Sequence, residues 1–146
     1  MLPPSSLVTL DSYQLITFET PEREPMSFEA IVVMDGSGLL MEFFTSSGQT
    51  VASISYDGGS VSFSSPFVPS RAIKAEYIIA DLQLLLYEEE ALEAALASSG
   101  LSFEAVSGRR CLRDGKSLVW ESWEEDGVTY VVNHLRSYSY AIEVLG

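Results

Sequence analysis

The sequence predicts an α+β fold that is mostly β, with about ten antiparallel strands interrupted by a helical insertion. Two observations support this prediction. First, Asp-Gly dipeptides separate stretches in which apolar and polar residues alternate, and Asp-Gly favours tight hairpin turns. Second, between residues 73 and 99 the apolar spacing becomes three to four residues, which is the period of a helix. The four dipeptides are Asp35-Gly36, Asp57-Gly58, Asp114-Gly115 and Asp126-Gly127.

The strands of the first half follow from period-two alternation. The clearest strand runs from Met26 to Met34, in which every second residue is apolar. Residues 39–45 are apolar on both faces except at Glu42, which is typical of a strand covered on two sides. Pro66 should end this half, because proline cannot donate a hydrogen bond to a sheet. The predicted strands are 13–19, 26–34, 39–45, 50–56 and 60–64, with a charged turn at 21–25 and a loose tether over 1–12.

Two helices are expected next. The first begins near Ile73 and carries apolar residues at helical spacing. The second begins at Glu88, since acidic residues are favourable at a helix N-terminus, and it stops at Gly100, a plausible C-terminal cap. The chain then returns to strands, predicted at 101–106, 109–113, 116–125, 128–134 and 138–145.

Composition limits the function. The 146 residues are 47% hydrophobic, with a mean hydropathy of +0.17, which supports a single domain over 1–146 with a real core. The net charge is −13, with eight Lys and Arg against 21 Asp and Glu. Nucleic acid is therefore excluded as a partner, and a charged partner should be basic. No apolar run approaches the roughly 20 residues needed to cross a bilayer.

Few residues suggest catalysis, and we expect neither a catalytic centre, nor a metal, nor a cofactor. His134 is the only imidazole, and it is interpreted as a histidine hydrogen-bonded near a strand end. Cys111, the only cysteine, excludes an internal disulfide. Glu121, with Glu124 and Glu125, is interpreted as an outward-facing solubilising acid rather than half of a glycosidase pair.

Half of the basic residues fall within eight positions, at Arg109, Arg110, Arg113 and Lys116. Solvated strand and turn positions are the simpler explanation for them. An anionic headgroup or an acidic patch on a partner is the alternative.

The apolar residues allow two interpretations. Helix-on-sheet packing explains most of them as core, since burying one large side chain contributes roughly 1.5–3 kcal/mol. Flexible methionines and aromatic rings on one wall would also suit an adaptable pocket for an acyl chain. The candidate cavity residues are Met26, Phe28, Met34, Met41, Phe43, Ile54, Phe63, Ile79, Leu82, Leu86, Trp120, Tyr130 and Tyr140.

Ordered blocks of the chain resemble a family of Gram-negative bacterial lipoproteins that is itself similar to LolB, the outer-membrane lipoprotein receptor. The resemblance spans about residues 13–144, nearly the whole chain. The blocks are Ser47-Gly48-Gln49 through Ser55-Tyr56-Asp57-Gly58, Ala80-Asp81-Leu82-Gln83-Leu84, Arg109-Arg110, Leu112-Arg113-Asp114-Gly115 and Val132-Asn133-His134.

The resemblance implies a LolA/LolB-like half-barrel in which the helices at 73–99 form a lid over an apolar cavity. It implies that the cavity takes up acyl chains, with the loop Thr45-Ser46-Ser47-Gly48-Gln49 facing the membrane. The start Met1-Leu2-Pro3-Pro4 is typical of a chain whose leader has been removed. On this basis a lipid anchor upstream would hold the protein at the periplasmic face of the outer membrane.

Three functions remain open at this stage. The leading hypothesis is a non-enzymatic envelope lipoprotein that binds acyl chains of a lipid or lipoprotein and transfers them, with a periplasmic carrier protein as a partner. The second is an interaction scaffold of the same fold that docks a basic envelope partner. A small hydrolase, the third, would require a cleft in which His134 or two carboxylates converge.

Overall fold

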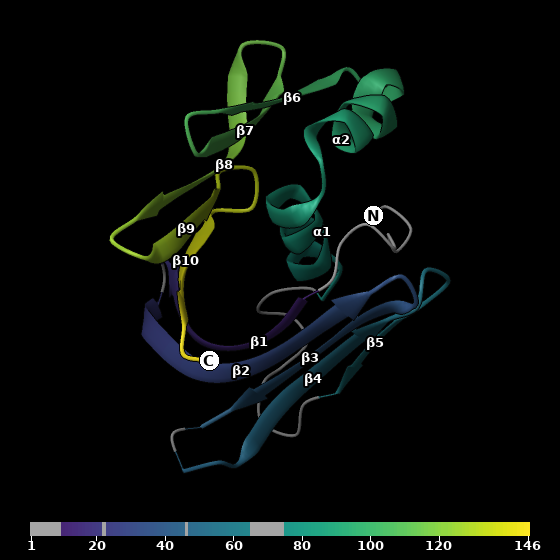
Figure 1. The fold of residues 1–146 in the computed structure, drawn as a ribbon. Coiled ribbons are helices and arrows are strands. Elements are labelled where there is room, and N and C mark those ends of the chain that lie inside the picture. Colours follow the sequence, from purple (N-terminus) through teal and green to yellow (C-terminus); the bar gives the residue numbers. More distant parts are fainter. Residues whose placement is uncertain (1–9, 22, 46, 65–74) are drawn as a thin grey trace. The chain divides into compact units, whose positions relative to one another are not determined.

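A computed structural model describes residues 10–21, 23–45, 47–64 and 75–146 (Figure 1). Ten strands form a single antiparallel sheet, and along the chain two α-helices come between the fifth and the sixth strand. The strands are β1 (Leu10–Thr20), β2 (Arg23–Asp35), β3 (Gly38–Phe44), β4 (Thr50–Tyr56), β5 (Val61–Ser64), β6 (Leu101–Val106), β7 (Arg109–Asp114), β8 (Ser117–Glu125), β9 (Val128–Asn133) and β10 (Tyr138–Val144). The helices are α1 (Ala75–Leu86) and α2 (Glu89–Leu96), followed by a 3₁₀ turn at Ala97–Ser99.

The strand order is β5-β4-β3-β2-β1-β10-β9-β8-β7-β6. Strands β1 to β5 therefore form one meander of sequential neighbours, and β6 to β10 form a second. The first and last strands join the two meanders. At this seam the Tyr13 amide donates to the Gly146 carbonyl at 3.0 Å, and the Leu145 amide donates to the Tyr13 carbonyl at 2.7 Å.

The chain divides into two compact units, which β1 and β2 both run through. The first unit contains the described residues within Met1–Leu15, Phe28–Gln83 and Val144–Gly146, and the second contains Ile16–Ser27 and Leu84–Glu143.

The core of the first unit follows from strand register. Directly opposed residues of antiparallel strands share a face of the sheet. Val32 opposes Met41, which in turn opposes Ile54, and all three are at most 2% exposed. Helix α1 buries its own apolar side within the same unit, through Ile78, Ile79 and Leu82.

The core of the second unit lies on one face of β6 to β10. Phe103 opposes Leu112, which opposes Trp120, and these three side chains are at most 9% exposed. A shift in register between Leu112 and Arg113 sets this alignment. Without that bulge Trp120 would oppose Cys111 and would point to the other face.

The predicted fold class is confirmed: the ten-stranded antiparallel sheet and mid-chain helices that a half-barrel requires are present. All four Asp-Gly dipeptides lie at hairpin connections, between β2 and β3, β4 and β5, β7 and β8, and β8 and β9. The helical insertion is confirmed over 75–99. Residues 1–9, 73 and 74 and Pro66 lie outside the described residues.

Two boundaries were wrong. Residues 10–12, assigned to a loose tether, begin β1. The predicted turn at 21–25 is shorter, because β2 already starts at Arg23 and includes Pro25. β3 pairs only with β2 residues from Glu29 onward, so Pro25 removes no hydrogen bond to β3.

Candidate functional site

The predicted cavity residues fall into two groups on the two units. In the first unit Met34, Met41, Phe43 and Ile54 lie on the buried face described above, with exposures of at most 5%. Phe63 opposes Ile54 on the same face and is half-buried. Phe28 is also half-buried and meets Phe43 edge-on, with ring centroids 6.4 Å apart, while Ile79 and Leu82 are the buried residues of α1.

The second unit contains the other predicted cavity residues. Trp120 and Tyr140 share the buried face of the sheet. Tyr140 opposes Val131, and Val131 opposes Ser122. Ser122 lies two residues from Trp120 on β8, so their side chains point to the same face. Tyr130 opposes Trp123 and therefore lies on the other face, so it is not on a wall with Trp120 and Tyr140. Leu86 is half-buried, and Met26, at 41% exposure, is at the surface.

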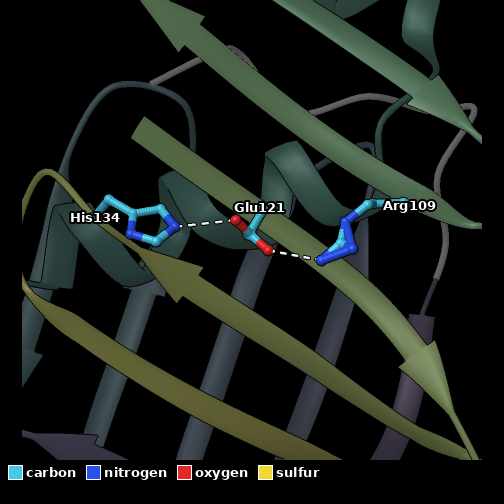
Figure 2. A network of polar contacts seen from close by, with 3 residues as sticks. All are labelled: Arg109, Glu121 and His134. Carbon is cyan, nitrogen blue, oxygen red and sulfur yellow. Dashed lines mark hydrogen bonds and ion pairs between the residues drawn. The ribbon is translucent and has the colours of Figure 1, made fainter. Parts of the chain in front are cut away.

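A polar network occupies the other face of the second unit, which we call the outer face (Figure 2). The Glu121 carboxylate accepts a hydrogen bond from Arg109 Nη2 at 2.8 Å and lies 3.0 Å from His134 Nε2. The Glu121 side chain is only 13% exposed, whereas Arg109 and His134 are 49% and 45% exposed. The expectation that His134 is hydrogen-bonded near a strand end is confirmed, but Glu121 is not a free solubilising acid. The sequence could not show this pairing, because it depends on the β7–β8 register.

Two stacked rings, Trp123 and Tyr130, extend this network, and we call them the aromatic ladder. The Arg109 guanidinium lies 4.9 Å from the centre of the Trp123 ring, and Trp123 stacks on Tyr130 with centroids 5.4 Å apart. A cation over an aromatic face is attracted by the ring quadrupole. Arg109 thus connects the ladder to Glu121 across three neighbouring strands.

A pocket of about 360 Å³ lies beside His134 in the same unit. Three segments line it: the end of β1 with Pro21, the end of β9, and the start of β10. Its lining residues include Glu19, Ser137 and Ser139. The third open function needed a cleft at His134, and this pocket meets that geometric requirement. In the described part of the chain, however, the imidazole has no hydrogen bond to a hydroxyl or thiol nucleophile.

Arg110 has a different role from its neighbour Arg109. Its Nε donates to the Leu84 carbonyl at 2.8 Å, and its Nη2 donates to the Tyr87 carbonyl. The guanidinium also lies 5.0 Å from the centre of the Phe103 ring. Partial burial lowers the pKa of Arg110 below its ordinary value, and the nearby Glu89 carboxylate opposes that shift. The expectation of a solvated arginine was wrong here, since Arg110 binds the carbonyls that α1 leaves unpaired at its C-terminus.

Glu89 provides a second attachment between the helices and the sheet. Its Oε2 accepts a hydrogen bond from the Ala105 amide of β6 at 2.6 Å, and α2 lies beside β6 (Figure 1). We call Arg110 and Glu89 the helix clasp. It fixes the α1–α2 junction to the β6–β7 hairpin.

Among the described residues, no group of three or more His, Cys, Asp or Glu side chains could hold a metal ion. Cys111 is half-buried and unpaired. None of the helices in the described ranges is both long and apolar enough to span a membrane.

One family model, described as Protein of unknown function (DUF3261), matches residues 11–146. A comparison with curated proteins found no match. The family match begins at the second residue of β1 and continues past the end of β10, so it includes all of the sheet except Leu10, and both helices. The chain therefore belongs to the DUF3261 family.

Proposed function

We propose that this protein is a non-enzymatic envelope lipoprotein that binds an acyl chain of a lipid or lipoprotein and carries or transfers it at the outer membrane. The binding wall would be the apolar face of β2 to β5, with α1 acting as a lid. The observation that carries the proposal is the composition of this face, which combines flexible methionines with aromatic rings at Met34, Met41, Phe43 and Phe28. Methionine adapts its shape at low cost, which suits a ligand as variable as a hydrocarbon chain.

The driving force would be dehydration of the chain, at about 0.8 kcal/mol for each buried methylene group. Since the wall residues are buried, entry of an acyl chain requires α1 or the wall side chains to move. The resemblance to LolB-like proteins supports the same function. It also supports the periplasmic face of the outer membrane as the location and a periplasmic carrier protein as a partner.

The test is lipid binding by variants that fill the wall. Mass spectrometry of lipids extracted from the purified protein should find acyl chains, and a fluorescent fatty acid should bind to the delipidated protein. Ile54→Phe enlarges a side chain that is 0% exposed on the wall and should weaken this binding. Leu40→Phe, at a site that is 41% exposed on the other side of β3, is the matched control and should not. Circular dichroism would establish that both variants fold.

Extracts free of lipid, with no fatty-acid binding by the folded wild-type protein, would contradict the proposal. A scaffold that docks a basic partner is the second candidate, and the net charge of −13 favours it. Capture of a basic envelope protein that is released at high salt, by a chain that binds no lipid, would support the scaffold instead.

A further inference from the structure

The pocket beside His134 lies outside the proposed acyl-chain wall and has a different chemistry. Its volume of about 360 Å³ falls at the low end of the ~300–1,000 Å³ usual for small-molecule sites. Its lining residues include Glu19, with a carboxylate, His134, with an imidazole, and three residues with hydroxyl groups, Thr20, Ser137 and Ser139. The pocket therefore offers charged and hydroxyl side chains beside apolar surface, which suits a small amphiphilic molecule.

The hydrogen bond to Glu121 selects the tautomer of the neutral His134 ring. Arg109 pairs with the Glu121 carboxylate, and a carboxylate can only accept hydrogen bonds. His134 Nε2 must therefore carry the proton that it shares with Glu121. In the neutral ring this leaves Nδ1 as an acceptor, and no residue in the described ranges uses it.

The second acceptor is Glu19. This residue is exposed at the rim of the pocket, and it has no ion pair among the described residues. The wider charge of −13 also attracts cations and repels anions. A positively charged ligand that carries N–H donors would satisfy both acceptors.

The β9–β10 turn that forms one side of the pocket is held in place. Asn133 Oδ1 accepts a hydrogen bond from the Arg136 amide at 2.9 Å, and Asn133 Nδ2 donates to the Tyr138 hydroxyl at 3.2 Å. Ser137 has a positive φ of 59°, which places this short turn in a defined left-handed conformation. A site that is already formed loses little entropy when it binds a ligand.

From these observations we propose that the pocket binds a small primary ammonium compound that also carries a hydroxyl group or ester oxygen, the chemistry of ethanolamine. The ammonium group pairs with Glu19 and donates to His134 Nδ1, while the serine and threonine hydroxyls meet the ligand oxygen. The same chemistry occurs in free amino alcohols and in the headgroup of phosphatidylethanolamine. This site does not depend on the acyl-chain proposal.

The test is an NMR titration of the ¹⁵N-labelled protein with ethanolamine. Amide signals at residues 19–20 and 132–139 should shift. Glu19→Gln should weaken binding by about two- to fivefold, the loss of one solvent-exposed ion pair. Glu143→Gln removes the same charge from an exposed position of β10 outside the pocket and should leave binding unchanged. Choline, which has the same charge but no N–H donor, should bind more weakly than ethanolamine.

Glu121 is a positioning residue in this scheme. Glu121→Gln should move the imidazole ¹⁵N signals of His134 away from a single tautomer and weaken ethanolamine binding less than Glu19→Gln does. Vesicles with phosphatidylethanolamine that bind the protein, where phosphatidylcholine vesicles do not, would identify a lipid headgroup as the source. Binding of free ethanolamine alone would identify a soluble amino alcohol. The absence of shifts, equal shifts with choline, or equal losses in Glu19→Gln and Glu143→Gln would overturn the proposal.

Discussion

The helix clasp should contribute measurably to stability, and Arg110→Met tests its larger part. Methionine keeps an apolar stem next to Phe103 but removes the guanidinium that donates to Leu84 and Tyr87. A hydrogen bond from a charged donor contributes roughly 1.5–3 kcal/mol. A cation at a helix C-terminus contributes about 0.3–1 kcal/mol more. Because the guanidinium is only half-buried and water can reach freed carbonyls, we expect a total loss of about 1.5–3 kcal/mol, below the sum of the separate contributions.

The measurement is urea unfolding followed by circular dichroism and by tryptophan fluorescence. Circular dichroism reports on α1 and α2, whereas Trp120 and Trp123 report on β8. The free energy of unfolding should fall about half as much in Arg110→Lys as in Arg110→Met. A lysine keeps the charge, but it lacks the planar guanidinium that donates to two carbonyls at once.

Arg113→Met is the matched control, because Arg113 lies on the same strand and has no ion pair among the described residues. Its free energy of unfolding should change by less than about 0.5 kcal/mol. An Arg110→Met variant as stable as the Arg113→Met variant would refute the clasp.

Three further predictions concern the turns and the core. Gly38→Ala should lower the free energy of unfolding by about 3 kcal/mol, because Gly38 has φ of 149° and a Cβ there would overlap the Tyr56 carbonyl oxygen. Gly48 has φ of 87° but lies in open space, so Gly48→Ala should lower it by only about 1 kcal/mol. Equal losses of the two variants in urea melts would contradict this account. Ile79→Ala should cost about 2–5 kcal/mol at a site that is 0% exposed, against under about 1 kcal/mol for Ile31→Ala at 40% exposure; thermal melts of both variants would check the difference. Hydrogen bonds from the amides of Gly59 and Ser60 lower the pKa of Asp57 in the folded protein below its ordinary 3.8. The ionised Asp57 therefore stabilises the fold above pH 3.8, and this stabilisation is lost as the pH falls through the lower pKa of the folded state. Asp57→Asn should therefore reduce the loss of stability between neutral pH and about pH 3, and a pH profile identical to that of the wild type would argue against this role.

The turns and the helical insertion could be predicted from sequence because their signals are local. An Asp-Gly pair needs only its own backbone to form a hairpin, and the Asp57 side chain caps its turn by accepting bonds from the Gly59 and Ser60 amides at 2.8 and 2.9 Å. The β6–β7 turn at Ser107-Gly108 has no aspartate, but both residues have positive φ, as a tight hairpin turn requires.

The positions of the polar side chains could not be predicted, because they depend on strand register. The bulge at Leu112 and Arg113 decides that Trp120 points into the core, and no residue type marks that bulge. The same register places Cys111 opposite Glu121 and Arg110 opposite Ser122, so one arginine meets the helices while its neighbour meets a glutamate. A count of charges in the sequence treats Arg109 and Arg110 as equivalent.

The seam between β1 and β10 has a consequence for protein synthesis. All other pairings in the sheet join strands that are consecutive in the chain, whereas one edge of β1 must wait for β10 to be made. Until Tyr138–Val144 emerges from the ribosome, β1 and β9 each present an unpaired row of amides and carbonyls. A chain that stops before this segment would keep these two strand edges unpaired, and unpaired edges pair readily with other chains. Premature termination should therefore yield aggregates rather than a smaller folded product.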